Sequence, residues 1–390
     1  MREYPVLLDG LRTPFGRFQG ALSGCSTRQL NAAVIRALLA RQPALATCDG
    51  VLLGQVLQAA QGQNPARLAA SEAGLPWTTP AATVNAVCPA GLVAVADACR
   101  RIHLREGSLY VVGGGDSMSR APHAGVLRPG LRGAGDLALT DTLIRDGLWC
   151  GIGDEGMGPV SERANVELGI SREVQDEIAL RSHRLAGQAT REGWLAGEIL
   201  PLDTRDSLLS RDEGIRDTTP EKLAKLKPAF VNGGSITSGN ASQMSDGAAI
   251  GVLASADRAE ALGAQPLARV IAWAETAGPD NTLHLKPADA VQRVLERAGG
   301  RLADIDLFEI NEAFAGVVEA SRARLGIPLD IVNVHGGAIA IGHPLGGTGF
   351  RLLLTLARAL ERSGGRYGIA ALCGGGGQGH AVLIENARRA

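Results

Sequence analysis

Two stretches that lie far apart in the chain share one plan, and this duplication constrains the fold more than any other feature. In the first, Cys88 and the glycine that follows it precede the apolar helix pattern "LVAVADACRRIHL", and the strand pattern "SLYVVGGGD" comes next. In the second, "GHPLGGTG" precedes the helix pattern "FRLLLTLARAL", and "YGIAALCGGGGQG" comes next. A repeated order of helix start, helix, strand and glycine turn predicts two similar halves. Halves that face each other would bring both helix starts and both glycine turns to one centre.

The two ends of the chain and its middle differ in pattern. Residues 1–117 and 244–390 alternate strand and helix patterns, which predicts an α/β protein with helix layers around a buried sheet. Residues 118–243 instead carry charged helix patterns and turn-rich segments such as "LRPGLRGAGD". We therefore predict three units: an N-terminal half over 1–117, an inserted loop domain or lid over 118–243, and a C-terminal half over 244–390.

The charge balance argues against several classes of partner. Lys and Arg total 39 against 40 Asp and Glu, so a formal net charge of -1 provides no global attraction for nucleic acid or an anionic membrane. We find no pattern of a secretion signal, and no apolar run approaches the roughly 18 residues of a membrane span. We expect a cytoplasmic protein without nucleic-acid or membrane partners.

Six cysteines are spread over the chain without a CxxC pair, so neither a disulfide framework nor a metal site is expected. Cys88 stands at a predicted helix start, where free backbone N–H groups and the positive end of the helix dipole favour a thiolate and lower the thiol pKa. Cys88 is therefore a candidate nucleophile. The alternative is a buried structural cysteine, which is the commoner role of an arbitrary cysteine.

Three further residues could take part in chemistry. Cys373 ends a strand pattern and opens "CGGGGQG", whose backbone amides could hold an oxyanion; otherwise it is a strand-end cysteine beside a turn. His343 in "GHPLGGTG" is presented by a turn and could accept a thiol proton, although alone it would be an ordinary turn histidine. Asn311 in "NEAFA" could orient a water or a carbonyl oxygen, and a helix cap is equally compatible with its position.

With these elements in order, the chain resembles the thiolase family, whose members make or cleave 3-ketoacyl-CoA thioesters. Nine segments resemble family segments in the family's order: "RTPFGRFQGAL", "GQNPARLAA", "NAVCPAGL", "GGGDSMSRAPH", "DEGIRDTTPEKLAKLKPAF", "SGNASQMSDGAA", "NEAFA", "NVHGGAIAIGHPLGGTG" and "CGGGGQG". The resemblance implies two similar βαβαβαββ halves in a layered α-β-α-β-α arrangement, with the insertion over the CoA site. It also implies a transferase of fatty acid metabolism that works by ping-pong acyl transfer.

The resemblance also implies roles for single residues. Cys88 would be the acylated nucleophile, His343 the base that activates it, and Cys373 the acid/base at the α-carbon of acetyl-CoA. Asn311 would hold a water that forms one oxyanion hole with His343, while the N–H groups of Cys88 and Gly375 would form the other. For CoA, Ser242 matches a position that contacts the pantetheine arm and Met157 matches a loop-domain residue of the same tunnel.

The same resemblance bears on partners and assembly. It implies CoA and acetyl-CoA as substrates, no permanently bound cofactor and a homodimer or homotetramer, the arm over residues 121–149 being similar to the tetramerising kind. A charged run could meet the CoA phosphates, although such runs are more often solvated faces; it comprises Arg211, Arg216, Lys222, Lys225 and Lys227.

Departures from the family pattern occur beside the predicted site. Pro89 and Ala90 follow the nucleophile where serine is frequent, Asp116 replaces a usual glutamate, and residues 280–290 differ from the common segment that would shape the acyl pocket. In that segment, Leu283, His284 and Lys286 are expected near the acyl chain.

Two other functions remain open at this point. A decarboxylating condensing enzyme of the ketoacyl synthase kind would have histidine in place of Cys373. A non-catalytic CoA-binding or lipid-binding protein on the same scaffold would lack the nucleophile or the histidine of "GHP".

Overall fold

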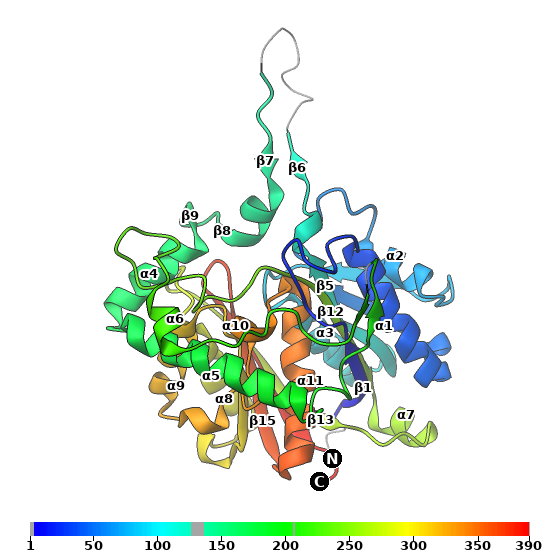
Figure 1. Ribbon diagram of the computed structural model, residues 1–390. Coiled ribbons are helices and arrows are strands. Elements are labelled where there is room, and N and C mark those ends of the chain that lie inside the picture. The colour runs from blue at the N-terminus through cyan, green and yellow to red at the C-terminus, as the bar shows by residue number, and fades with distance from the viewer. Residues whose placement is uncertain (1–3, 126–135, 206, 390) are drawn as a thin grey trace.

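Ten strands form one large sheet in the computed structural model, which describes residues 4–125, 136–205 and 207–389 (Figure 1). In chain order they are β1 (Val6–Arg12), β2 (Gly16–Arg17), β3 (Gly50–Gly54), β4 (Ala81–Val84), β5 (Leu109–Ser117), β12 (Ser245–Ala254), β13 (Ala268–Ala277), β14 (Leu307–Ile310), β15 (Tyr367–Gly374) and β16 (Gln378–Asn386). Their order across the sheet is β14-β15-β16-β13-β1-β12-β5-β3-β4, and the short β2 pairs with β12.

The N-terminal and C-terminal α/β sections have their strands and helices in the same order. The helices of these sections are α1 (Thr27–Arg41), α2 (Pro65–Glu72), α3 (Ala90–His103), α7 (Ala256–Ala261), α8 (Lys286–Ala298), α9 (Ala315–Leu325), α10 (Ala338–Ile341) and α11 (Leu345–Ser363). The strand order β1-β12-β5-β3-β4 is matched by β13-β16-β15-β14, and the counterpart of β4 is reduced to one parallel bridge between Phe308 and Val332. Two similar α/β halves are thus confirmed.

The halves join where β1 pairs antiparallel with β13, at Val6 opposite Arg269 and Leu7 opposite Ala268. Strand β12 hydrogen-bonds with β1 and β5, so it lies among the strands of the first half. The division into residues 1–117, 118–243 and 244–390 stays a prediction.

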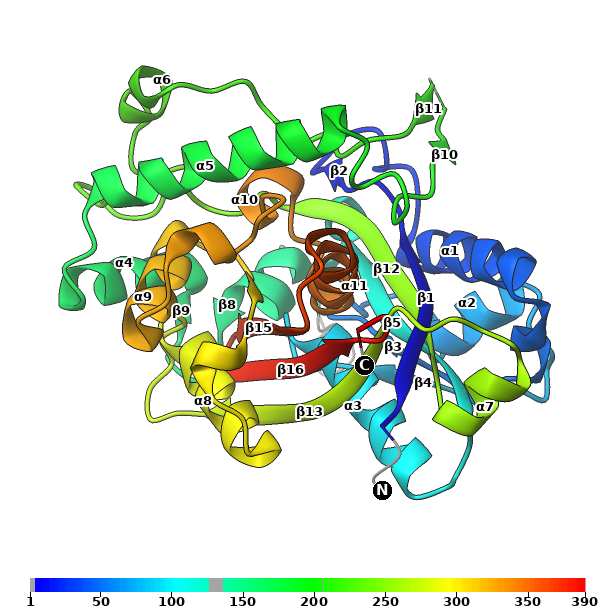
Figure 2. The same cartoon turned by 90° about the horizontal axis from the view of Figure 1, so that it is seen from below.

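Helices α3 and α11 pack side by side in the middle of the molecule, between the two groups of strands (Figure 2). They share one apolar core with both halves, for example Leu92 of α3, Leu353 of α11, Val112 of β5 and Val382 of β16. Helices α1 and α2 cover the outer face of the first half, and α8 packs on the outer face of the second with α9 against it. This arrangement is the predicted series of α-β-α-β-α layers.

Glycines let α11 approach its neighbours at backbone distance. A Cβ on Gly346 would lie 2.6 Å from the carbonyl oxygen of Gly54, and one on Gly349 would lie 2.7 Å from the nitrogen of Leu92. Side chains at these positions would push α11 away from β3 and α3. The glycine-rich start of α11 therefore places His343, just before the helix, close to the start of α3.

The middle of the chain lies over one end of these layers. Its elements are β6 (His123–Ala124), β7 (Thr140–Asp141), η3 (Leu143–Leu148), β8 (Trp149–Cys150), β9 (Glu155–Gly156), α4 (Met157–Glu167), α5 (Arg172–Arg191), β10 (Leu202–Asp203), β11 (Leu208–Leu209) and α6 (Pro220–Ala224). The paired β6 and β7 project from the body as an arm, although residues 126–135 of the predicted tetramerisation segment lie outside the described residues (Figure 1). Within the described ranges, no helix combines the length and apolar character needed to cross a membrane.

Candidate active site

Cys88 lies in the tight turn between β4 and α3. The preceding Val87 adopts a left-handed backbone with φ of 55°, which is unfavourable for a β-branched residue. The turn is closed by the N–H of Ala90, which donates to the carbonyl oxygen of Val87 at 3.0 Å, and by the N–H of Val87, which donates to Oδ1 of Asn85 at 2.9 Å. A strained turn of this kind is typical of functional sites, because the surrounding structure must hold it in place.

The thiol of Cys88 is protonated at neutral pH. Burial raises its pKa to about 12, the N–H groups of Cys88 itself and of Gly375 act in the opposite direction, and the negative charge of Asp116 raises it further. The lowered pKa expected from the helix start is therefore wrong, since the cost of burying a thiolate exceeds the gain from the amide donors. Cys88 needs a base before it can act as a nucleophile.

Cys373 and its glycine turn lie against Cys88. Cys373 is 1% exposed at the end of β15, and both burial and the neighbouring Cys88 raise the pKa of its thiol. A Cβ on Gly374 would lie 2.7 Å from Cδ of Pro89, and the N–H of Gly375 faces Cys88 closely enough to lower the pKa of its thiol. The two halves thus bring both predicted cysteines to one place.

His343 precedes α11, and its ring is held by polar contacts on both sides. Nδ1 lies 2.7 Å from Oγ1 of Thr348, and the Thr348 hydroxyl is also 3.0 Å from the carbonyl oxygen of Pro344. Because that carbonyl can only accept, the Thr348 hydroxyl donates to it and accepts from Nδ1–H of His343. This assignment leaves Nε2 without a proton. Burial and the positive charge of Arg351 lower the pKa of His343 to about 3, so the ring is neutral and can act as a base.

Asn311 reaches His343 from the end of β14. Its Nδ2 lies 3.4 Å from Nε2 of His343, and its backbone N–H donates to the carbonyl oxygen of Ala371 at 3.0 Å. The Asn311 side chain is fully buried, yet Oδ1 has no hydrogen-bond partner in the described part of the chain. A buried amide oxygen without a partner is costly, which fits a position that binds a water or a substrate group.

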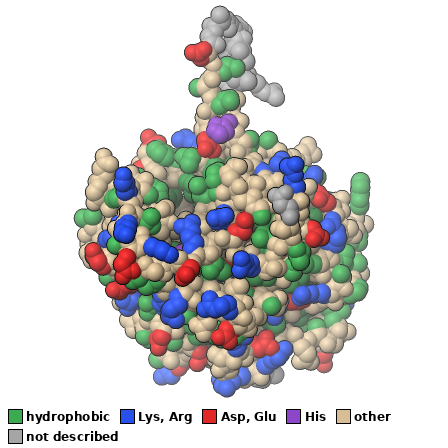
Figure 3. Space-filling view, viewed as in Figure 1, with side chains coloured by type: hydrophobic (Ala, Val, Ile, Leu, Met, Phe, Trp, Pro, Cys, Tyr) green, Lys and Arg blue, Asp and Glu red, His purple; other side chains and the backbone are tan. Residues whose placement is uncertain are grey.

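A cavity of about 780 Å³ reaches inward to His343 and is lined by the loop domain and both halves. Its predicted members are His343, Ser242 and Met157. Cys88, Cys373 and Gly375 lie behind its inner end: Cys88 packs with Leu345 and Cys373 with Met157, both of which line the cavity. Hydrophobic side chains gather beneath the base of the β6–β7 arm (Figure 3), and the apolar lining includes Ile144, Leu148, Trp149, Phe230, Met244 and Phe314. The cavity suits a long, largely apolar ligand arm.

Two arginines supply positive charge to this cavity. Arg216 lines it, as does Arg17, which the sequence analysis missed, and burial together with the like charge of Arg17 lowers the pKa of Arg216. The other members of the predicted charged run do not line it; these are Arg211, Lys222, Lys225 and Lys227. Two neighbouring cations at a cavity are a typical anion-binding arrangement.

Comparisons with known proteins agree with this architecture. The sequence model of the thiolase N-terminal domain matches residues 6–257, and that of the thiolase C-terminal domain matches residues 264–386. The chain belongs to the thiolase family. Among its thiolase relatives, a probable acetyl-CoA acetyltransferase of Mycobacterium leprae is 44% identical over 97% of this chain and 98% of that protein. The acetyl-CoA acetyltransferase of Shinella zoogloeoides is 41% identical over 98% of each protein.

Solved thiolase structures share the whole fold. The crystal structure of the Bacillus anthracis acetyl-CoA acetyltransferase superposes with a TM-score of 0.94 at 37% identity, covering 99% of both chains. Human mitochondrial 3-ketoacyl-CoA thiolase gives a TM-score of 0.95 at 34% identity, covering 98% of this chain and 99% of that one. The present thiolase is therefore an enzyme, an acyltransferase.

The residues that depart from the thiolase pattern have definite places in this thiolase. Asp116 is fully buried and accepts N–H groups of Val56, Leu57 and Gly346, so it ties β5 to the start of α11. Burial raises its pKa to about 6 against the effect of these donors. In the sequence Asp116 stands out only as a substitution, because its bridging role depends on contacts with distant segments.

The three side chains singled out in the segment over 280–290 have different partners. Leu283 packs in the apolar cluster that contains Cys373. His284 instead contacts Asn165 at 2.7 Å, and Nζ of Lys286 donates to the carbonyl oxygen of Gly278 at 2.8 Å. Of the three residues expected to shape the acyl pocket, Leu283 alone lies in the cluster of Cys373.

Proposed function

We propose that the chain catalyses CoA-dependent acyl transfer by a ping-pong mechanism through an acyl-Cys88 intermediate, with acetyl-CoA as a substrate. The observation that carries this proposal is the meeting of Cys88, the Gly375 amide and Cys373 behind a cavity that ends at a neutral His343. The names of the relatives support acetyl-CoA as the acyl donor.

In the first half-reaction, Nε2 of His343 accepts the thiol proton while the sulfur of Cys88 attacks the thioester carbonyl. The negative charge on the carbonyl oxygen is stabilised by the N–H groups of Cys88 and Gly375. The proton then leaves with the CoA thiolate, and the acyl group remains on Cys88. A thiol with a pKa of about 12 requires such a base, and Nε2 of His343 is unprotonated and able to serve.

In the second half-reaction, the acyl group leaves Cys88 for one of two acceptors. In condensation, Cys373 passes its thiol proton to Nε2 of His343, and its thiolate removes the α-proton of a second acetyl-CoA. The resulting enolate, with Nε2–H of His343 at its oxygen, attacks the carbonyl carbon of acyl-Cys88. The Cys88 thiolate leaves and takes the proton back from His343, which completes the Claisen condensation. Thiolysis runs these steps in reverse: Cys88 attacks the keto group of a 3-ketoacyl-CoA, the carbon–carbon bond breaks, and Cys373 protonates the released acetyl-CoA enolate. The thiol of CoA then takes the acyl group from Cys88. Asn311 would hold a water that shares the stabilisation of the enolate oxygen with His343; its unpartnered Oδ1 supports this role.

The loop domain over 118–243 would form a lid on the CoA arm. Ser242 and Met157 line the cavity and would contact the pantetheine part, while Arg17 and Arg216 would meet the phosphates. We further propose a cytoplasmic homodimer or homotetramer. The projecting β6–β7 arm and the terminal position of β4 in the sheet support an assembly.

Separating the two half-reactions tests the proposal. Wild-type enzyme should cleave acetoacetyl-CoA in the presence of CoA and give parallel lines in double-reciprocal plots, as ping-pong transfer requires. The variant Cys373→Ala should still take an acetyl group from acetyl-CoA but lose cleavage, and Cys88→Ala should lose both. Intersecting lines, or cleavage by Cys88→Ala, would contradict the mechanism.

A further inference from the structure

The hairpin of β8 and β9 contacts the glycine turn that carries Gly375. The thiol of Cys150 in β8 is 3% exposed, and its sulfur accepts the N–H of Gly153 at 3.4 Å. The hairpin also touches the glycine turn itself, because a Cβ on Gly376 would lie 3.3 Å from Cδ1 of Ile152. The hairpin closed by Cys150 thus packs on the turn one residue away from Gly375.

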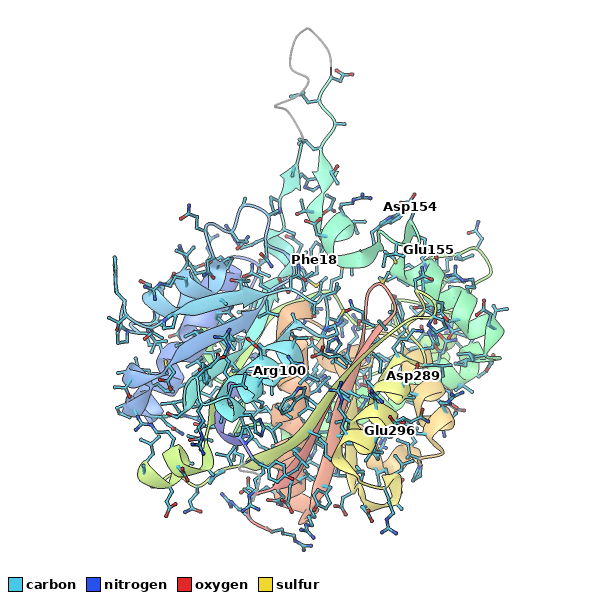
Figure 4. All side chains as sticks on the ribbon, turned by 180° about the vertical axis from the view of Figure 1, so that it is seen from behind. Phe18, Arg100, Asp154, Glu155, Asp289 and Glu296 are labelled. Atoms are coloured by element: carbon cyan, nitrogen blue, oxygen red, sulfur yellow. The ribbon has the colours of Figure 1, made fainter. Side chains whose placement is uncertain are left out.

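Asn281, from the loop between β13 and α8, completes the contact. Its Nδ2 lies 3.7 Å from the sulfur of Cys150 and donates to Oε1 of Glu155 at 2.9 Å. Its Oδ1 accepts from Arg163 at 3.1 Å, and Arg163 also pairs with both carboxylate oxygens of Glu155 at 2.8 and 2.9 Å. The orientation of the Asn281 amide is therefore fixed from both ends. Glu155 and Asp154 lie near the turn between β15 and β16 (Figure 4).

The same loop holds the far side of the glycine turn. The N–H of Gly278 donates to the carbonyl oxygen of Gly377 at 2.9 Å, and a Cβ on Gly377 would lie 1.9 Å from the carbonyl oxygen of Asp280. Gly376 and Gly377 have φ of 79° and 74°, so the turn needs glycine at both positions. Glycines provide no side-chain packing and lose much backbone freedom on ordering, so contacts from outside must fix this turn.

We propose that Cys150 and Asn281 are positioning residues that hold Gly376, and through it the N–H of Gly375, at the sulfur of Cys88. This inference rests on the proposed function for its catalytic consequence. The N–H of Gly153 and Nδ2 of Asn281 lower the pKa of Cys150 despite its burial, which agrees with a sulfur that serves as a hydrogen-bond acceptor. The role of Cys150 is thus to bind amides, whereas Cys88 reacts.

The test compares the alkylation rate of Cys88 in four variants, measured by iodoacetamide labelling and peptide mass spectrometry at one pH. Cys150→Ala and Asn281→Ala should slow labelling of Cys88 about tenfold, because a displaced Gly375 amide no longer stabilises its thiolate. Cys150→Ser, which keeps an acceptor, should restore most of the rate. Cys48→Ala is the matched control: Cys48 is also buried but belongs to the core cluster beneath α1, and its loss should leave the rate unchanged.

Thiolysis kinetics provide the second readout. We expect kcat to fall about tenfold in Cys150→Ala and Asn281→Ala, with KM for CoA within about twofold of wild type, because the displaced amide acts on the transition state. Wild-type labelling of Cys88 in both alanine variants, at an unchanged melting temperature, would overturn the inference. If the wild-type enzyme cannot be acetylated, the proposed function is overturned instead. The comparison of Cys88 labelling rates would still test whether Cys150 and Asn281 position the Gly375 amide. If Cys150→Ala does not fold, Asn281→Ala decides the outcome.

Discussion

Nδ1 of His343 lies 2.7 Å from Oγ1 of Thr348, one turn into α11. The threonine hydroxyl donates to the carbonyl oxygen of Pro344 and so accepts from Nδ1, which fixes the tautomer that leaves Nε2 free. The carbonyl of Pro344 at the start of α11 therefore sets the direction of the Thr348 hydroxyl. That hydroxyl in turn determines which ring nitrogen of His343 can act as a base.

Removing that hydroxyl should reduce turnover more than binding. Thr348→Val lets the proton of His343 move to Nε2, so we expect kcat to fall about 10²-fold while KM for CoA changes little. Thr348→Ser keeps the hydroxyl and should retain most of the activity. Steady-state thiolysis kinetics measure both, and a Thr348→Val enzyme with wild-type kcat would contradict the tautomer assignment.

Arg216 should affect CoA binding rather than chemistry. Arg216→Gln removes one of the two arginines at the cavity, and a charge-assisted hydrogen bond to phosphate corresponds to a rise of about tenfold in KM for CoA. The effect should shrink at high salt, because ions screen the interaction. Arg211→Gln is the control, since Arg211 is exposed and does not line the cavity. Equal KM values for the two variants would remove Arg216 from the CoA site.

The contact between Gly374 and Pro89 should tolerate no extra atom. Gly374→Ala would place a Cβ 2.7 Å from Cδ of Pro89, so we expect the free energy of unfolding to fall by about 1–3 kcal/mol and kcat to drop as the glycine turn shifts. Gly24→Ala is the control: it adds the same methyl group, but the new Cβ has no neighbouring atom within 4 Å. Thermal unfolding and thiolysis rates measured on both variants test this, and identical behaviour would show that the two halves are less closely packed here.

Buried His284 should make stability depend on pH. Burial lowers its pKa from 6.5 to about 4, so the unfolded chain binds a proton that the folded chain does not between these two values. The free energy of unfolding therefore falls as the pH drops through this window, by about 2 kcal/mol between pH 7 and pH 5. His284→Gln should reduce this loss, whereas His123→Gln, at an exposed position, should not. Urea unfolding at the two pH values measures the difference, and equal losses in all three proteins would refute the assignment.

Much of the fold can be predicted from the sequence, because the elements of its internal repeat are each encoded by neighbouring residues. Each helix start, helix and strand of the repeat is encoded by neighbouring residues, and α3 and α11 duly lie together in the central layer. The strands that pair with β12 could not be predicted in this way. Its strand pattern is clear, but its pairing with β1 and β5 depends on residues far away in the sequence.

The site shows the same limit. Cys88, Cys373, His343 and Asn311 stand out because each sits in or directly beside a loop with a recognisable sequence. Thr348, Asp116 and Cys150 act through contacts with other segments, and no local pattern distinguishes them from ordinary residues. The direction of the Cys88 pKa shift was mispredicted for a related reason: a helix start is visible in the sequence, whereas the burial that outweighs it depends on the packed structure.

The most direct test of the acyl-enzyme mechanism is to incubate the purified protein with acetyl-CoA alone, quench in acid and locate the acetyl group by peptide mass spectrometry. We predict one acetyl group on Cys88, which free CoA removes and which is absent from Cys88→Ala. Acylation of Cys88 by longer 3-ketoacyl-CoA thioesters alone would keep the mechanism and change the substrate. A Cys88 that no acyl-CoA modifies, or an acetyl group on another cysteine, would contradict the account.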